Sequence, residues 1–303
     1  LLRMRANPLE EVRACADAML VELRKVIPAF LRRVDLPDRG VAWSDYLAGT
    51  KERVAAVANE LFGDELFANE PAADRPEVLL TDADPDGEVK VAAAAMYAAT
   101  GLPDDALLER ARKLTGDERR RVIEAYAGTR ANRRHRPGRA FERTDYRFDV
   151  LCDYGAFRDL QRHRLLTIEW QRLSPAHGFE MAPEIEEAGA LEDWTRTMDE
   201  SAALHDELAG AVSPEVAQYA VSMAYRVRFV MQMNAREAMH LIELRSTPQG
   251  HPVYRRVAQR MHGLIAEVHP AIAAAMTFVD HSSVELERLE AERRTEARRQ
   301  ATE

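Results

Sequence analysis

Two stretches of this chain, one at its amino end and one near its carboxyl end, share residues at matching positions. With a two-residue gap after the third position, Leu2, Arg5, Pro8, Arg13, Ala16, Met19, Val26, Pro28 and Ala29 correspond in order to Ile242, Arg245, Pro248, Arg255, Ala258, Met261, Val268, Pro270 and Ala271. Self-similarity at a fixed offset is the signature of a repeated structural unit. Two amphipathic helices of similar composition would also match by accident, and the sequence leaves both explanations open.

The repeat predicts how the chain is divided. Residues 1–70 are expected to be the carboxyl-terminal helical tail of a first repeat, which makes the chain a fragment with earlier residues missing. Residues 71–88, rich in Pro and Asp and poor in apolar periodicity, are expected to be a linker. Residues 89–303 are expected to be a nearly whole second repeat that ends in a charged helical tail from Glu285 onward, a solvated or partner-facing helix.

The apolar spacing along the second repeat predicts a fold dominated by helix. Helices are expected over Val89–Ala99, from Asp104, after Asp117 and over Tyr154–Arg164, and then over the segments 192–208, 214–245 and 253–290. Between Arg139 and Leu151 polar and apolar residues alternate, as in a strand with one buried face. We therefore expect an α+β, helix-rich fold with a small sheet.

Composition limits the class of protein. No stretch reaches the roughly 18 uncharged apolar residues that a membrane helix needs, so we expect a soluble protein without a membrane partner. A net charge of −9 argues against a general nucleic-acid binder. Cys15 and Cys152 are too few for a disulfide framework or a thiolate metal site, which favours a reducing cytoplasm and no metal.

The first candidate site is the triplet Arg162-His163-Arg164. On a helix Arg158 and Arg162 share a face while His163 points elsewhere, so the triplet could contact a ligand and its own scaffold together. Guanidinium groups bind phosphate in a bidentate manner, which suggests a phosphorylated ligand. A solvated basic face of a helix is the alternative.

The second candidate site begins at Asn234-Ala235-Arg236 and continues through His240 to Arg245. Asn234, Arg236 and His240 are polar residues within an otherwise apolar segment that is expected to be helical. Burial of polar groups costs free energy unless they find partners, so a ligand or other side chains must satisfy them. Salt bridges from Glu237 and Glu243 alone would be the structural alternative.

The order of these motifs resembles that of the flavin-dependent thymidylate synthases. Arg-His-Arg is followed about seventy residues later by Asn-Ala-Arg-Glu, a His and Leu-Arg, and Phe141-Glu142 stands where that family has a Phe-Glu-His element. The resemblance spans roughly residues 90–275. It implies that family's fold, with a small antiparallel sheet packed on long helices, and a homo-oligomer: a dimer of tandem chains or a tetramer.

The resemblance also implies an activity and roles for single residues. Family members methylate dUMP with FAD as cofactor and with NADPH and methylenetetrahydrofolate as co-substrates. The cofactor-binding residues would be Arg143, Arg162, His163, Arg164, Asn234, Arg236 and His240. The substrate-binding residues would be Arg158, Arg162, Arg172, Ser174 and Arg245, with Arg245 at the uracil as the catalytic residue.

Several positions depart from the family pattern on the nucleotide side. Asp159 replaces the Gln that precedes the triplet, which places a negative charge where a nucleotide phosphate is expected. Arg143 replaces the His of the Phe-Glu-His element, Ser174 is displaced, and Gln218 replaces an Arg. These changes predict a site that is altered or has lost activity.

Two other functions remain open. The chain could be a non-catalytic repeat that completes the flavin sites and the oligomer of a tandem enzyme. It could also be a nucleic-acid or nucleotide-binding module that uses the basic cluster Arg130, Arg133, Arg134, Arg136 and Arg139, although a solvated loop is favoured by the net acidity.

Overall fold

The computed structural model describes residues 1–63 and 75–282, which belong to two compact units. Unit 1 consists of Leu1–Asp74 together with Ala203–Ala220. Unit 2 consists of Arg75–Ala202 together with Val221–Glu303 and holds the sheet. The division near residue 74 falls close to the end of the expected first-repeat tail.

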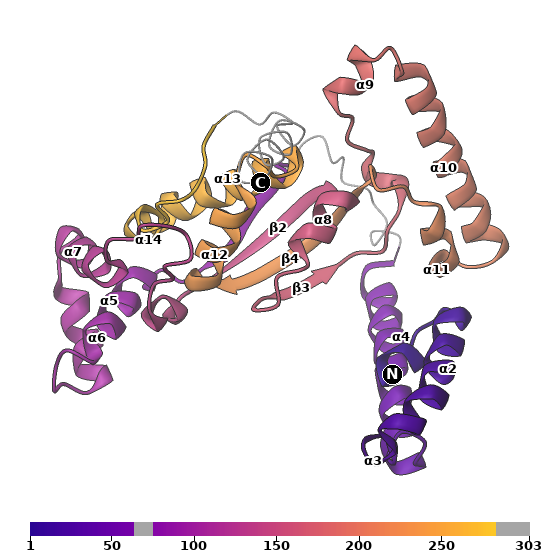
Figure 1. Cartoon of the computed structure of the whole chain (residues 1–303), viewed down its shortest axis with the longest axis horizontal. Helices are drawn as coiled ribbons and strands as arrows, with labels where there is room; N and C mark the ends of the chain where they lie inside the picture. Colours follow the sequence, from indigo (N-terminus) through magenta and orange to yellow (C-terminus); the bar gives the residue numbers. More distant parts are fainter. Residues whose placement is uncertain (64–74, 283–303) are drawn as a thin grey trace, which may run out of the picture. The chain divides into compact units, whose positions relative to one another are not determined.

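The centre of unit 2 is an antiparallel sheet of four strands within the described residues (Figure 1). Its strands are β1 (Val78–Ala83), β2 (Asp145–Asp153), β3 (Thr167–Trp170) and β4 (Arg226–Asn234). They are ordered β1-β2-β4-β3, so the two longest strands lie in the middle. The expected α+β class with a small antiparallel sheet is confirmed.

Strand β4 corrects the sequence-based expectation of a helix over 214–245. Burial along the strand alternates strictly: Val227, Phe229, Met231 and Met233 are buried and the residues between them are not. Val230 on the outer face makes Phe229, Val230 and Met231 a continuous apolar stretch, which hides the two-residue period. The helix prediction holds only for α11 (Pro214–Ala217) and α12 (Ala235–Arg245).

Two other predictions from the sequence also need correction, one of a strand and one of a linker. The stretch expected to be a strand from Arg139 begins as a 3-10 helix, η4 (Arg139–Arg143), and β2 follows it. Strand β1 lies within the segment 71–88 that was expected to be a linker, and it pairs with β2 from Val78 to Ala83. The sequence analysis predicted neither β1 nor β3, because strands of six and four residues are too short to give a clear periodic signal.

Helices pack against the sheet and bury its core. Helix α13 (Pro252–Val268) packs against β1, β2 and α8 (Tyr154–Leu160), and α14 (Pro270–Ala274) packs against α13. The expected helix over 253–290 is therefore broken at His269, and its residues beyond 282 lie outside the described chain. Large side chains of the strands fill the core, among them Tyr146, Phe148 and Phe229.

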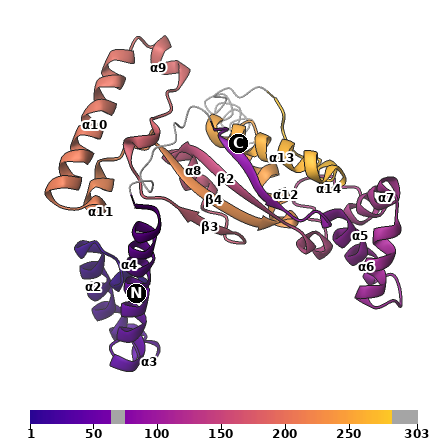
Figure 2. The same ribbon diagram turned by 180° about the vertical axis from the view of Figure 1, so that it is seen from behind.

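Three further helices gather at one end of the sheet (Figures 1 and 2). They are α5 (Gly87–Tyr97), α6 (Asp104–Lys113) and α7 (Gly116–Ala127), close to the positions expected from the sequence. Helix α7 begins with a capping box in which the Thr115 side chain accepts from the Glu118 amide and the Glu118 carboxylate accepts from the Thr115 amide. Gly101 and Pro103 separate α5 from α6, and the Thr115 N-cap marks the start of α7.

Unit 1 is built from helices in the described residues. It contains α1 (Leu2–Arg5), α2 (Glu10–Val26), α3 (Pro28–Leu31), a π-turn (Pro37–Val41), α4 (Ala42–Phe62) and, from the second segment, the last turns of α10 (Leu191–Ala211) with α11 and η6 (Gln218–Ala220). A short helix, α9 (Pro183–Glu187), precedes α10 in unit 2. A small core of Leu20, Leu31 and Val34 holds α2 and α3 together.

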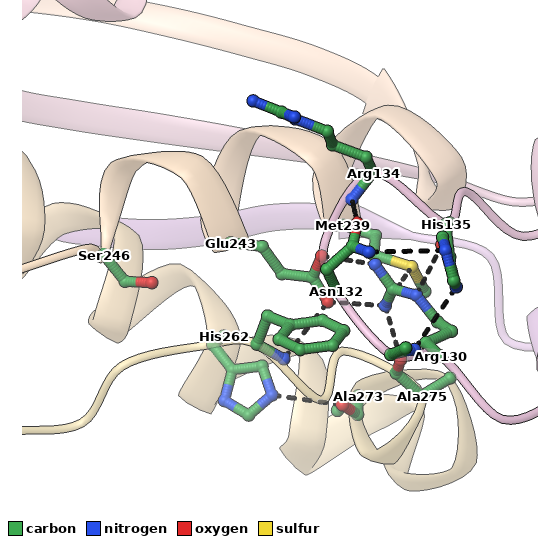
Figure 3. A network of polar contacts seen from close by, with 12 residues as sticks. Arg130, Asn132, Arg134, His135, Met239, Glu243, Ser246, His262, Ala273 and Ala275 are labelled. Carbon is green, nitrogen blue, oxygen red and sulfur yellow. Dashed lines mark hydrogen bonds and ion pairs between the residues drawn. The ribbon is translucent and has the colours of Figure 1, made fainter. Parts of the chain in front are cut away.

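The basic loop, residues 128–138 between α7 and η4, is fastened by a buried ion pair (Figure 3). Two guanidinium nitrogens of Arg130 donate to the two carboxylate oxygens of Glu243 on α12, each at 2.6 Å, and the two side chains are 3% and 1% exposed. Arg130 also donates to the carbonyl oxygens of His135 and Ala275 and lies over the Phe278 ring. Arg130 therefore serves the fold and is not available to a nucleic acid.

No helix in the described part of the chain is both long enough and apolar enough to cross a membrane.

Replacing the buried acid of this pair should strongly destabilise the protein. In Glu243→Ala the Arg130 guanidinium would stay buried without its counter-charge, so the free energy of unfolding should fall by about 3–5 kcal/mol. Urea unfolding measures the change. The control is Arg196→Ala, which removes an exposed ion-pairing side chain of α10 and should cost less than about 1 kcal/mol. Equal effects of the two substitutions would contradict the role given to Glu243.

Candidate functional site

Helix α12 carries three residues of the candidate site, Glu237, His240 and Arg245, and the helix begins directly after Asn234. The Asn234 side-chain oxygen accepts from the Glu237 amide at 2.9 Å, which makes Asn234 the N-cap of the helix. Asn234 is the last residue of β4, so the sheet fixes where α12 begins. The structure thus gives this residue a capping role that its polar character within an apolar run did not reveal.

A chain of hydrogen bonds joins the two sequence motifs inside unit 2. His163 lies 3.0 Å from the Glu237 carboxylate through Nδ1, and Nε–H of Arg245 donates to His163 Nε2 at 3.2 Å. Because a guanidinium can only donate, Nε2 must be the accepting nitrogen and Nδ1 carries the proton that goes to Glu237. The buried imidazole is therefore a fixed link between Glu237 and Arg245.

Asp159 completes the surroundings of Arg245. Its carboxylate lies 3.6 Å from one Arg245 nitrogen and 3.4 Å from Nε of Arg162, and its backbone carbonyl accepts from Arg245. The guanidinium of Arg245 also lies 5.3 Å from the ring centre of Tyr254, a cation–π contact. Asp159 is thus paired with two arginines, which offset the negative charge that stands where a nucleotide phosphate was expected.

His240 is the partly exposed member of the site. Its ring meets that of His163 edge-on, with centroids 5.5 Å apart. Burial lowers the pKa of His240, and the guanidiniums of Arg136 and Arg133 in the basic loop lower it further. His240 therefore marks where the basic loop and the motif on α12 come together.

The ligand atoms of His163, Glu237 and His240 lie within 4.8 Å of one another, close enough to surround a cation. Both ring nitrogens of His163 already take part in hydrogen bonds, and the Arg245 cation lies on one of them. A metal ion would have to displace Arg245 and the proton shared with Glu237. The arrangement fits a hydrogen-bonded relay better than a metal centre.

Arg236 holds the basic loop rather than lining an open site. Its Nε donates to the Pro137 carbonyl at 2.9 Å and another of its nitrogens pairs with Glu142 at 3.2 Å. Within residues 1–63 and 75–282, the side chains of Arg133 and Arg136 form no ion pair, and the Arg136 side chain is exposed. The basic loop is attached to α12 through Arg130 and through Arg236, and it presents positive charge.

The remaining expected site residues are more dispersed. Arg158, Arg162 and Arg164 are exposed around the end of α8. Arg143 is exposed and pairs with Asp104 at 3.6 Å. Ser174 caps a 3-10 helix, η5 (Pro175–His177), by accepting from the Ala176 amide, and Arg172 lies just before it beyond β3. The structure therefore brings together His163, Arg245, Glu237 and Asp159; Glu237 and Tyr254 were not among the expected site residues.

The fold and this site define a class of protein that comparison with known proteins identifies. The family model described as "thymidylate synthase complementing protein" matches residues 77–271. The chain belongs to this family, the flavin-dependent thymidylate synthase family that its motifs resemble, and that prediction is confirmed. The match covers the sheet, the relay and all the expected site residues.

Relatives match beyond the family model as well. A UPF0159 protein of Chlamydia muridarum is 36% identical over 296 residues, which cover 97% of this chain and 55% of the relative. A UPF0159 protein of Thermoplasma acidophilum is 39% identical over 206 residues, covering 67% of this chain and 41% of the relative. The chain spans about half the length of the chlamydial relative. Its amino-terminal helices are part of the shared sequence.

Among solved structures, the UMP/dUMP methylase PolB from Streptomyces cacaoi, bound with 5-Br dUMP, has a similar fold. The TM-score is 0.52 at 20% sequence identity, and the match covers 68% of this chain and 96% of PolB. At this identity the likeness shows the fold alone.

The relay makes a prediction about Glu237. Glu237→Ala leaves the buried Nδ1–H of His163 without an acceptor, which should lower the free energy of unfolding by about 1–3 kcal/mol. Glu237→Gln keeps an acceptor oxygen and is the matched control, with a smaller loss. Urea unfolding gives the stabilities, and nitrogen NMR of the imidazole should show the proton on Nδ1 of His163 in the unchanged protein. A proton on Nε2 would contradict the relay.

Proposed function

We propose that this chain is part of an enzyme that methylates the uracil ring of a uridylate nucleotide, dUMP or an altered form of it. Membership of the thymidylate synthase complementing protein family supports this activity. PolB, which has a similar fold, is described as a UMP/dUMP methylase. Methylenetetrahydrofolate would supply the carbon and NADPH the reducing electrons, and the enzyme would act as a homo-oligomer.

The observation that carries the proposal is the fixed orientation of Arg245. Its side chain is 14% exposed, and His163, Asp159 and the Tyr254 ring hold it from three sides. A guanidinium fixed in this way can hold a uracil carbonyl oxygen and stabilise negative charge that develops there, with no reorganisation during the reaction. Arg245 is thus proposed as the catalytic residue, and Glu237 and His163 orient it.

The residues around His240 have the chemistry that a flavin dinucleotide requires. FAD carries a diphosphate, and the guanidiniums of Arg133 and Arg136, which form no ion pair within residues 1–63 and 75–282, lower the pKa of His240. Arg162 and Arg164, both exposed, add positive charge on the other motif. When bound, FAD would supply the hydride-transfer chemistry. The residues of this chain would bind the diphosphate and orient the nucleotide.

The role of Asp159 follows from its pairing. Its carboxylate pairs with both Arg245 and Arg162. The Gln that the family has at this position could not form such ion pairs. A phosphate that binds Arg162 would compete with Asp159 for that guanidinium. This competition supports an altered nucleotide preference, with Arg158, Arg172 and Ser174 as further candidate substrate contacts.

Flavin binding tests the proposal directly. The purified full-length protein is expected to retain FAD or take it up, to lose the visible flavin absorbance with NADPH, and to regain it when methylenetetrahydrofolate and dUMP are added. A protein that neither contains nor takes up flavin would refute the proposed cofactor and activity together.

Substitution of Arg245 distinguishes between two functions of this chain. The first is the proposed catalytic function, and the second is that of a non-catalytic repeat that completes the sites and the oligomer of a tandem enzyme. Arg245→Lys keeps the charge but loses the planar group that contacts His163, so kcat/KM should fall about a hundredfold. Arg196→Ala, on α10, is the control and should leave turnover unchanged. Unchanged turnover in Arg245→Lys would favour the non-catalytic repeat.

A further inference from the structure

Helices at the two ends of the chain have matching boundaries. A shift of 242 residues carries Glu10 to Pro252 and Val26 to Val268, so both ends of α2 fall on the ends of α13, and each helix has 17 residues. The same shift carries the start of α3, Pro28, to the start of α14, Pro270. The helix before each pair, α1 with 4 residues and α12 with 11, ends at Arg5 in one case and at Arg245 in the other. The structural match extends the internal sequence similarity.

An equivalent arginine has a similar role in each copy. Arg13 on α2 donates to the backbone carbonyls of Asn7 and Pro8, at 2.8 and 2.7 Å, in the turn after α1. Arg255 on α13 donates to the carbonyl of Ser246, the C-cap of α12, at 3.3 Å. In both places the arginine of the longer helix satisfies the carbonyl groups that follow the preceding helix.

The two copies differ in what covers them. In α13 and α14, Val257, Met261 and Ile272 are fully buried because these helices pack in the core of the sheet-containing unit. The matching residues of unit 1 are Cys15, Met19 and Phe30. Cys15 is exposed, Met19 is 43% exposed and Phe30 is 86% exposed. Positions that are buried in α13 and α14 are therefore exposed in α2 and α3. The described part of unit 1 contains no strand, so it has no sheet that could cover them.

We propose that α1, α2 and α3 are the closing helices of a second domain of the same family, and that the face formed by Cys15, Met19 and Phe30 docks on the sheet of that domain. The sheet would be carried by a segment of polypeptide outside these 303 residues. The chlamydial relatives have room for it, because they match 97% of this chain with only 55% and 54% of their own lengths.

A second copy of this chain fits the surface less well. In a second molecule of this chain, α13 already packs against β1 and β2 of the sheet. That α13 would have to leave the sheet before α2 and α3 of the first molecule could dock there. The contact of Tyr219 with Glu11 lies at the start of α2 and leaves Met19 and Phe30 exposed. The favoured occupant is therefore a sheet that lacks helices of its own. Arg5 would then stand in that domain where Arg245 stands in this one.

The accessibility of Cys15 tests this proposal without any need for enzymatic activity. The chain has two cysteines, Cys15 exposed and Cys152 buried, and peptide mass spectrometry can follow each one separately. The natural full-length polypeptide is treated with a maleimide under native conditions and in urea. We expect Cys15 to react at least about tenfold more slowly in the native protein, because docking removes the thiol from solvent. Reaction at the rate of the unfolded chain would overturn the proposal.

Two variants and a dilution series test whether the protection of Cys15 comes from docking within one polypeptide. In Cys15→Ala/Ala18→Cys the thiol moves to the position that matches Arg260, which is exposed on α13, so it should react rapidly in the native protein. Phe30→Asp should abolish the protection of Cys15 by preventing docking. Protection should not change on dilution. Protection that is lost on dilution would show a second copy as the occupant and would also overturn the proposal.

Discussion

The burial of two carboxylates on α12 is the constraint on which the structure around the site depends. A buried carboxylate is tolerated only with a charged or hydrogen-bonding partner, so each of the two must draw a side chain from a distant part of the sequence. Glu243 takes Arg130 and thereby fastens the basic loop. Glu237 takes His163 and thereby connects the Arg-His-Arg motif to the helix. One helix thus organises both sides of the site.

The position of Arg245 follows from the same arrangement. His163 can accept from Arg245 only while its other nitrogen donates to Glu237, so the acid on α12 fixes the arginine two turns further along the same helix. Asp159 and Tyr254 hold the guanidinium from α8 and α13. The result is a nearly buried cation in a protein of net charge −9, on the same helix as His240, whose pKa the arginines of the basic loop lower. Such local positive charge in an acidic protein is suited to one anionic ligand.

Much of the fold was predictable, and the exceptions have physical causes. The helices α5, α6 and α7 lie close to their expected positions, because α5 is Ala-rich, Gly101 and Pro103 end it before α6 begins, and α7 follows soon after. Strand β4 was mistaken for helix because Val230 on its outer face hides the alternation of Phe229 and Met231. Strand β1 was missed because six residues beside a Pro-rich segment give too short a pattern. In both cases pairing with β2 decided the structure, and local sequence does not encode that pairing.

The sequence by itself determined the family, since the order and spacing of the two motifs are properties of the chain alone. It also predicted His163 and Arg245 as candidate site residues, and the structure joins their side chains by a hydrogen bond. Only the tertiary structure decided what the other polar residues do: Asn234 caps α12, Arg236 holds the Pro137 carbonyl, and Arg130 is buried against Glu243. The reason is that a side chain's role depends on which partners lie within hydrogen-bonding distance, and those partners lie about 75 to 115 residues away in the sequence for most of these contacts.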